Sequence, residues 1–179
     1  MGLALMAVME DLECTMVVRS QTSKEKLDGL RAMGVDLVLV DGELPPEDPA
    51  SYNQTARRMA AERPSAYFPD QHNNRENSEA HYRTTGPEIW RQMAQDIDYL
   101  VAGIGTGGTI SGTGRYLKEQ NPDVQVWGID TYGSVFKKYH ETGEFDPKEI
   151  YPYITEGIGE DILPKNVDFK VIDHFEKVT

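Results

Sequence analysis

Short apolar runs and longer amphipathic stretches alternate along the chain. Residues 15–19 and 35–40 are rich in β-branched and apolar side chains, which is typical of buried strands, and residues 66–68 predict a shorter strand. The stretches around these runs predict helices. We expect helices over residues 2–11, where apolar positions recur at helical spacing, and over residues 22–33 and 51–63.

Local signals mark where these helices begin and end. Thr22 and Glu25 match the T-x-x-E capping box at a helix start, and Gly34 stands where a glycine often closes a helix. Pro64 ends the third helix, because the residue before a proline is pushed out of helical geometry. Residues 41–49 hold three prolines and four acidic residues, so we expect a solvated surface loop there.

The second half of the chain continues the alternation. A polar loop over residues 69–78 leads into a predicted helix over residues 79–95. The further elements expected are a strand over 98–102, a helix over 110–119, a strand ending at Asp130, a loop with a short helix over 131–146, an irregular glycine-punctuated stretch over 147–164 and a strand over 167–173. This order of strands and helices implies parallel strands with right-handed crossovers, and therefore an α/β fold.

A glycine-rich loop, GIGTGGT over residues 103–109, joins the strand over 98–102 to the helix over 110–119. Without Cβ atoms in the way, backbone N–H groups of such a loop converge on one point. The loop lies at a helix N-terminus, where unpaired N–H donors and the positive end of the helix dipole favour an anion. Each charge-assisted hydrogen bond contributes roughly 1.5–3 kcal/mol, so the loop is predicted to hold a phosphate.

Two kinds of phosphate ligand fit this loop, and a tight turn without any ligand is a third interpretation. The glycines match the G-x-G-x-x-G fingerprint of dinucleotide-binding folds over residues 103–108, and Asp130 ends the next strand where a ribose-binding carboxylate belongs. That fingerprint usually follows the first strand of its domain, whereas here several strands precede it. Thr106 and Thr109 add hydroxyl groups, which suit a terminal phosphate better than a pyrophosphate.

The amino-acid composition excludes several classes of binding partner and site. Eighteen basic and thirty acidic residues give a net charge of −12, which argues against binding to nucleic acid or to an anionic membrane. The single cysteine, Cys14, excludes an internal disulfide framework and any multi-cysteine zinc site. His140 and His174 have no partners at ligand spacing, so no metal site is predicted. No membrane-length apolar run or signal peptide is evident, and we expect a cytoplasmic protein.

Three segments of the sequence resemble one family of enzymes. The loop GTGGT, residues 105–109, resembles the phosphate loop of cysteine synthases and cystathionine β-synthases. HYRTTGPEI, residues 81–89, resembles the segment that precedes this loop in the family, and EGIG, residues 156–159, with Pro164, resembles a later turn. The glutamate of that turn favours cystathionine β-synthase. These enzymes depend on pyridoxal phosphate and have the tryptophan-synthase-β fold, also called fold type II.

The resemblance implies a pyridoxal 5'-phosphate site. It implies cofactor-binding roles for Gly105, Thr106, Gly107, Gly108, Thr109, Gly157 and Ile158. It also implies substrate-binding roles for Gln71 and Gly157. His72 follows Gln71 at a position where relatives often carry an aromatic residue, and the role of His72 stays open. No catalytic residue and no metal ligand are predicted in this segment.

The family's reaction is a β-replacement, in which a thiol displaces the β-substituent of serine or of an O-activated serine such as O-acetylserine. The thiol is homocysteine in cystathionine synthesis and sulfide in cysteine synthesis. The resemblance therefore implies small amino-acid substrates and a homodimer. The family fold implies two Rossmann-like three-layer αβα units with largely parallel sheets, here residues 1–77 as part of the smaller mobile domain and residues 78–179 as part of the larger cofactor-binding domain.

The resemblance covers an internal segment of the family's sequence. The Schiff-base lysine and the Ser/Thr-Gly-Asn-Thr-Gly loop of these enzymes have no match here, and no lysine of this chain resembles the family's lysine context. We therefore expect the segment alone to be inactive. Two alternatives stay open at this point: an NAD-dependent oxidoreductase, and a non-catalytic fragment that binds phosphate or cofactor.

Overall fold

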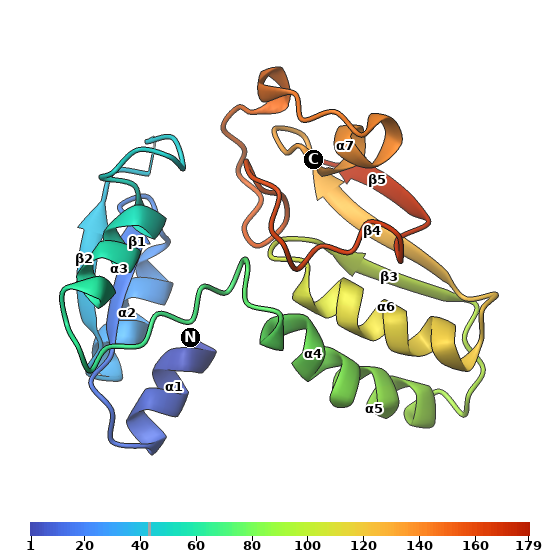
Figure 1. Cartoon of the computed structure of the whole chain (residues 1–179), viewed down its shortest axis with the longest axis horizontal. Helices are drawn as coiled ribbons and strands as arrows, with labels where there is room; N and C mark the ends of the chain where they lie inside the picture. Colours follow the sequence, from blue (N-terminus) through green and yellow to red (C-terminus); the bar gives the residue numbers. More distant parts are fainter. Residues whose placement is uncertain (43) are drawn as a thin grey trace. The chain divides into compact units, whose positions relative to one another are not determined.

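The computed structural model describes residues 1–42 and 44–179 of the chain (Figure 1). Glu43, within the predicted acidic loop 41–49, lies outside the described residues. The chain divides into two compact units, Met1–Phe68 and Pro69–Thr179. Each unit holds its own parallel sheet and its own apolar core, so the two are described separately.

The first unit contains a two-stranded parallel sheet. Strand β1 (Thr15–Arg19) pairs with β2 (Asp36–Val40), and helix α2 (Lys24–Ala32) makes the crossover between them. Helices α1 (Gly2–Met9) and α3 (Tyr52–Ala61) complete the unit. The core of the unit forms around Ala4, Leu30 and Val35. The β-α-β order expected from the sequence is therefore confirmed.

Two local predictions in this unit are wrong. Helix α2 has Ser23 at its N-cap and no side-chain capping bond, so Thr22 and Glu25 do not form a capping box. The N–H of Thr22 instead donates to the carbonyl of Arg19 at 3.0 Å, which makes a turn after the strand. Residues 66–68 form no strand; a turn after α3, with the N–H of Ala66 bonded to Arg63 O at 2.9 Å, occupies this region.

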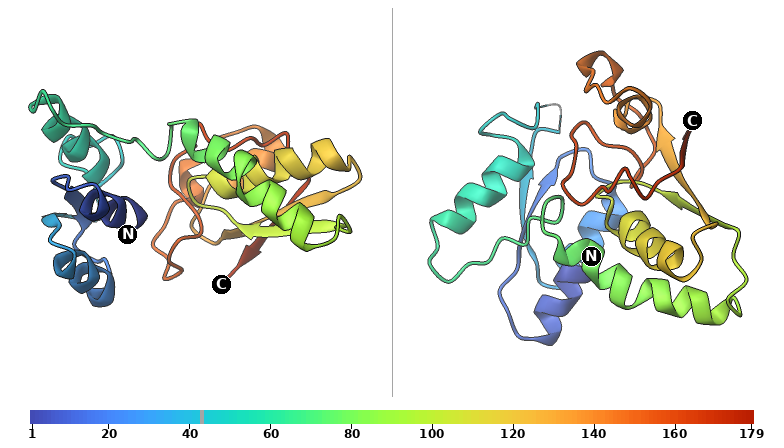
Figure 2. Two further views of the ribbon diagram at one scale, coloured as in Figure 1. Left: turned by 90° about the horizontal axis from the view of Figure 1, so that it is seen from below. Right: turned by 45° about the vertical axis from the view of Figure 1, so that its right-hand side comes forward.

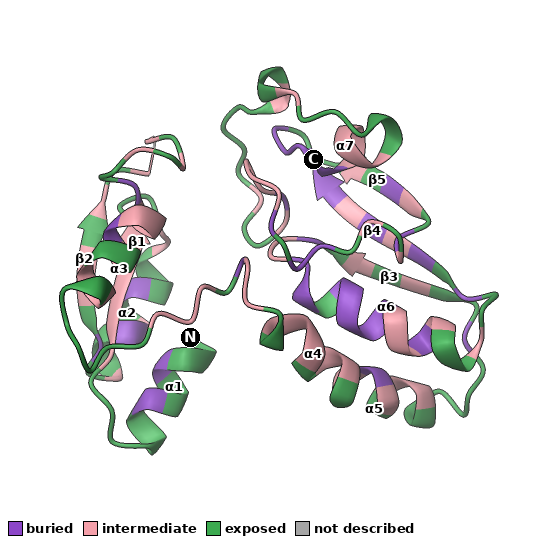
Figure 3. Cartoon of the chain, viewed as in Figure 1, coloured by how far each residue is buried: buried purple, intermediate pink, exposed green. Residues whose placement is uncertain are grey.

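The second unit contains a three-stranded parallel sheet in the order β3-β4-β5. Its elements are β3 (Tyr99–Gly103), α6 (Gly108–Gln120), β4 (Gln125–Thr131), α7 (Phe136–Thr142), the 3-10 turn η1 (Pro147–Glu149) and β5 (His174–Val178). Figure 3 shows that buried residues concentrate in α6 and the central strand β4. The core joins Ile110 of α6 and Phe136 of α7 to Val126 and Phe175 of the sheet.

The strand predicted over residues 167–173 is wrong, because this segment forms no strand and β5 (His174–Val178) follows it. Asp168 explains the difference, because its carboxylate accepts the N–H of Lys170 at 3.1 Å and turns the chain. The N–H of Asp168 donates to Ser111 Oγ at 2.9 Å, which fixes this turn on α6. Val167 and Ile172 are buried in the core from an irregular segment, although their apolar character resembles that of a strand.

The single helix predicted over residues 79–95 is also wrong, because the structure has two helices there. Helix α4 (Glu76–Arg83) ends at Thr84, whose φ of −122° and ψ of −69° leave helical geometry, and α5 (Thr85–Gln92) follows. Pro87 explains the interruption, since it lacks an N–H and its ring crowds the carbonyl four residues earlier. Both views in Figure 2 show α4 and α5 alongside α6.

Helices α4 and α6 pack closely because glycines allow it. A Cβ at Gly112 would overlap the carbonyl oxygen of Ser78, so the two backbones nearly touch. Polar contacts join the same helices: Arg115 donates to Glu79 at 2.7 Å, and the His81 ring lies 3.1 Å from Thr109 Oγ1. This packing fixes the start of α6 against α4.

The α/β fold with parallel sheets is thus confirmed, while residues 1–42 and 44–179 do not form complete three-layer αβα units. Helices α6 and α7 cover the face of the three-stranded sheet that carries Val126 and Phe175. Side chains of alternate residues point to the opposite face. There Tyr99 and Val101 are more than half exposed.

Replacing Gly112 by alanine should destabilise the second unit by about 1–3 kcal/mol, the usual cost of added volume in a tight contact. The new methyl group would force α4 and α6 apart at Ser78. Chemical denaturation followed by circular dichroism measures the loss. Gly29→Ala in α2 is the matched control, since its Cβ would meet only the flexible end of Met1. A stability loss as large in the control would contradict the packing argument.

The stability of the protein should fall at mildly acidic pH, in part through His81. Burial lowers the pKa of His81 from its ordinary value of 6.5. Below that value the unfolded chain binds a proton that the folded chain resists, so folding weakens as the pH drops. His81→Gln should flatten the decline in melting temperature between about pH 7.5 and about pH 5.5. Identical slopes for the wild type and His81→Gln would contradict this role.

Candidate functional site

The glycine loop leaves the carboxyl end of β3 and turns into the first residue of α6. Gly107 is the N-cap of α6 with a φ of +83°, in the left-handed region that favours glycine. A Cβ at Gly107 would lie 2.5 Å from Val167 Cγ2, so a side chain has no room there. The predicted strand-loop-helix arrangement is confirmed, and Gly107 is the residue on which its backbone path depends.

The start of α6 presents free backbone donors. The first bond of the helix runs from the N–H of Ser111 to the carbonyl of Gly107 at 3.0 Å. The N–H groups of Gly108, Thr109 and Ile110 precede that bond and have no acceptor within the helix. With thirteen residues α6 is long enough for a developed dipole whose positive end lies at this loop. These features suit an anion such as a phosphate.

A cavity of about 330 Å³ adjoins the loop. The glycine loop forms most of its wall, and Gln71, Gly157 and Glu160 complete it. Six of the predicted site residues, Gly105, Thr106, Gly107, Gly108, Thr109 and Gly157, line this cavity together with Gln71. The structure therefore brings together residues that lie up to 86 positions apart, from Gln71 to Gly157.

Ile158, the remaining predicted residue, stands beside the cavity. Its side chain packs against Gly103, where a Cβ would lie 3.0 Å from Ile158 Cγ1. The turn that carries Gly157 and Ile158 is attached to the loop by the N–H of Gly159, which donates to Ile104 O at 2.7 Å. Gly157 and Gly159 have φ values of +82° and +86°, so the turn needs glycine at both positions. Ile158 thus supports the loop from outside the cavity wall.

Two asparagines that the sequence did not single out as site residues hold the cavity together. Asn77 donates to the carbonyl of Gln71 at 2.7 Å and to Thr106 Oγ1 at 3.1 Å, and its amide fills the space beside Gly108. Asn166 donates to the carbonyl of Gln71 at 2.8 Å. Asn77 lies in the polar loop that precedes the predicted helix over 79–95, and in the structure it is in the first turn of α4. Its position in the sequence therefore indicates only a turn or cap residue. No sequence signal distinguishes Asn166.

Asp130 is separated from the cavity. Its side chain is fully buried, and Oδ2 accepts the N–H of Lys137 at 3.1 Å, at the start of α7. A ribose-binding carboxylate must face the ligand, whereas this carboxylate faces a helix start. The glycines of the dinucleotide fingerprint therefore lie at the cavity without the acidic residue that the NAD interpretation requires.

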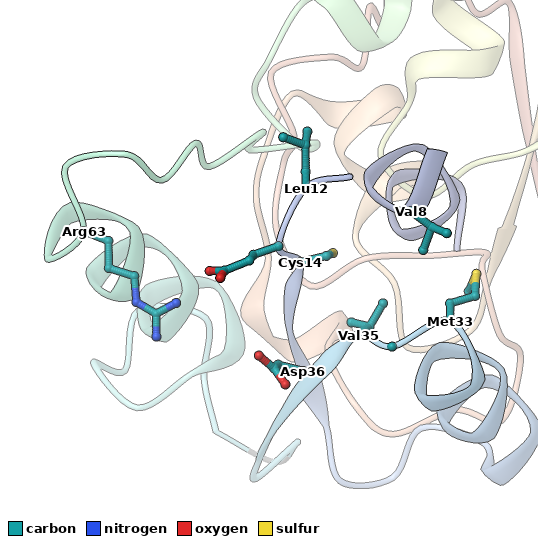
Figure 4. Close-up of a pocket in the computed structure, with 9 residues that line it drawn as sticks. Val8, Leu12, Cys14, Met33, Val35, Asp36 and Arg63 are labelled. Atoms are coloured by element: carbon teal, nitrogen blue, oxygen red, sulfur yellow. The ribbon is translucent and has the colours of Figure 1, made fainter. Parts of the chain in front are cut away.

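A second cavity, of about 420 Å³, lies in the first unit beside Cys14, Met33 and Arg63 (Figure 4). None of the predicted site residues lines it. Residues 1–42 and 44–179 contain no group of three or more histidine, cysteine, aspartate or glutamate side chains that could hold a metal ion. Across the same residues, no helix has the length and apolar character to cross a membrane.

The proteins that this chain resembles in sequence belong to a family whose cofactor carries a phosphate, which agrees with an anion site at the glycine loop. The family model of pyridoxal-phosphate dependent enzymes matches residues 1–179. Cystathionine beta-synthase of Oryctolagus cuniculus is 39% identical over 99% of this chain, and cysteine synthase of Helicobacter pylori is 35% identical over 99%. The chain covers 32% of the first protein and 54% of the second, so it spans about a third of one relative and about half of the other.

A solved structure is similar to this chain over nearly its whole length. The crystal structure of a hydrogen sulfide-producing enzyme from Fusobacterium nucleatum aligns with 99% of this chain at a TM-score of 0.86 and 25% identity, and the chain covers 56% of that structure. The family resemblance inferred from the glycine loop and the EGIG turn is thereby confirmed. The chain belongs to the family of pyridoxal-phosphate dependent enzymes and is homologous to cystathionine beta-synthases and cysteine synthases.

Proposed function

We propose that the cavity at the start of α6 binds pyridoxal 5'-phosphate, with the phosphate on the glycine loop. The N–H groups of Gly108 and Thr109, which have no acceptor within α6, support this proposal, because they lie at the positive end of the helix and their residues line the cavity. The hydroxyl groups of Thr106 and Thr109 add two further donors. Pyridoxal phosphate, when bound, supplies the electron sink for reactions at the α-carbon of an amino acid.

The residues around the loop orient the ligand. Gln71 reaches the cavity from the loop after residue 68, and its backbone is fixed by Asn77 and Asn166. Gly157 brings backbone close to the ligand from the other side. We assign Gln71 and Gly157 to substrate binding and Gly157 also to the cofactor wall, while Ile158, predicted to bind the cofactor, is assigned to supporting the loop at Gly103.

The reaction we propose for the whole protein is a β-replacement on serine or O-acetylserine by a thiol, either homocysteine or sulfide. Relatives named cystathionine beta-synthase at 37–39% identity support the cystathionine-forming version, and a relative named cysteine synthase 3 at 37% identity supports the cysteine-forming one. We also propose that residues 1–77 belong to the smaller domain and residues 78–179 to the larger, and that the enzyme is a cytoplasmic homodimer. Within the described residues no lysine lines the cavity, so this chain needs a lysine from elsewhere in the enzyme to react.

Two alternatives remain. An NAD-dependent oxidoreductase would need Asp130 at the ligand, and the burial of this residue argues against it. A non-catalytic fragment that binds the cofactor without turning it over has the same cavity and differs only in activity.

Thr106→Val should weaken pyridoxal phosphate binding about 10- to 100-fold, because it removes one hydroxyl donor to a charged group at nearly constant volume. Fluorescence titration with pyridoxal phosphate measures the change. Thr142→Val is the matched control; Thr142 Oγ1 bonds to the carbonyl of Lys138 at the end of α7, away from the cavity. Equal affinity of both variants, or tight NAD binding that is lost in Asp130→Ala, would overturn the proposal.

The chain on its own should bind the cofactor without catalysing the replacement. Saturated with pyridoxal phosphate and supplied with serine and homocysteine, it should form cystathionine no faster than free pyridoxal phosphate does. Chromatographic detection of cystathionine tests this expectation. Turnover clearly above the free-cofactor rate would require a reactive lysine within these 179 residues and would contradict the assignment.

A further inference from the structure

A histidine and a glutamate form a pair at the wall of the cavity. The Nε2 atom of His72 lies 3.4 Å from Oε1 of Glu160, and the side chains are only 6% and 17% exposed. Glu160 lines the cavity, and its carboxylate lies beside Gly105, 3.8 Å from where a Cβ would stand. The wall that faces the anion-binding loop thus carries a nearly buried carboxylate.

The backbone on each side of the pair is fixed. The carbonyl of His72 accepts the N–H of Asn166 at 3.2 Å. The N–H of Glu160 donates to Ser134 Oγ at 3.1 Å, and its carbonyl accepts the N–H of Val135 at 3.2 Å. Because both backbones are held, the contact between the side chains sets the direction of the Glu160 carboxylate.

This carboxylate has accepting capacity to spare. An ionised carboxylate offers about four acceptor sites on two oxygens. Within the part of the chain that the structure describes, His72 is the side chain that contacts it. A carboxylate beside an anion site weakens anion binding unless the ligand also brings a positive charge. The cavity therefore combines donors for a phosphate with an acceptor for a cation.

We propose that Glu160 determines ligand specificity by accepting a hydrogen bond from a protonated amine, and that His72 is the positioning residue that aims its carboxylate. The ligand class is a phosphate ester that also carries an ammonium group. This inference rests on the proposed function, since it takes the phosphate to lie on the glycine loop, and it adds that a phosphate ester with an ammonium group binds more tightly than one of the same shape with a hydroxyl group.

Pyridoxamine 5'-phosphate and pyridoxine 5'-phosphate are suitable probes, because they differ only in an ammonium group and a hydroxyl group. Isothermal titration of the whole chain should show pyridoxamine phosphate binding roughly 10-fold or more tighter, the worth of a charge-assisted hydrogen bond. Glu160→Gln should abolish this preference, while binding of pyridoxine phosphate stays equal or becomes tighter. Glu156→Gln, which removes an equal charge from the same turn outside the cavity, should keep the wild-type preference.

Variants at His72 distinguish a loss of Glu160 positioning from a general loss of folding. His72→Phe should reduce the preference for pyridoxamine phosphate by at least about threefold without weakening pyridoxine phosphate, whereas His72→Gln, which keeps a donor, should retain it. Equal affinities for the two probes in the wild type, or equal losses in Glu156→Gln and Glu160→Gln, would overturn the inference and leave the proposed function standing. Failure of both probes and of pyridoxal phosphate to bind would overturn the proposed function as well.

Discussion

The close approach of backbone to backbone around the glycine loop is the constraint on which the second unit depends. Val167 occupies the space beside Gly107, Asn77 the space beside Gly108, and the carbonyl of Gly157 the space beside Gly105. Three separate segments therefore meet at this turn because Gly105, Gly107 and Gly108 carry no side chains. The same glycines line the cavity at the start of α6, so the packing and the proposed anion site have a common cause.

Much of the fold could be predicted from the sequence. The strand over residues 15–19, the turn at Gly34 and the glycine loop depend on local signals that no distant contact overrides. The predicted secondary structure was wrong where a tertiary contact or a single residue determines the local conformation. Val167 and Ile172 are apolar because they fill the core from a turn, and a strand assignment from hydrophobicity alone cannot distinguish that case. Pro87 breaks a helix that its neighbours would otherwise continue.

The residues that line the candidate site could be predicted where a sequence motif marks them. The residues that hold those lining residues in place could not be predicted. The glycine loop and the EGIG turn are short patterns with a chemical reason behind each residue. Asn77, Asn166 and the His72–Glu160 contact arise only when segments far apart in the chain meet. For Asp130 the motif was misleading. Its position in the sequence fits a ribose-binding carboxylate, but in the structure the buried side chain accepts the N–H of Lys137 at the start of α7.

The bond from Asn166 to Gln71 spans 95 residues, and it has a consequence for the order in which the protein acquires its site. A contact between such distant positions must overcome the entropy of closing a long loop, so it forms late. During synthesis the glycine loop and α6 emerge well before Asn166. A nascent chain that stops short of this residue carries the phosphate-binding motif with its Gln71 wall incompletely fastened. The wall at Gln71 is thus completed only after Asn166 has been synthesised, when β3, α6 and β4 have already emerged.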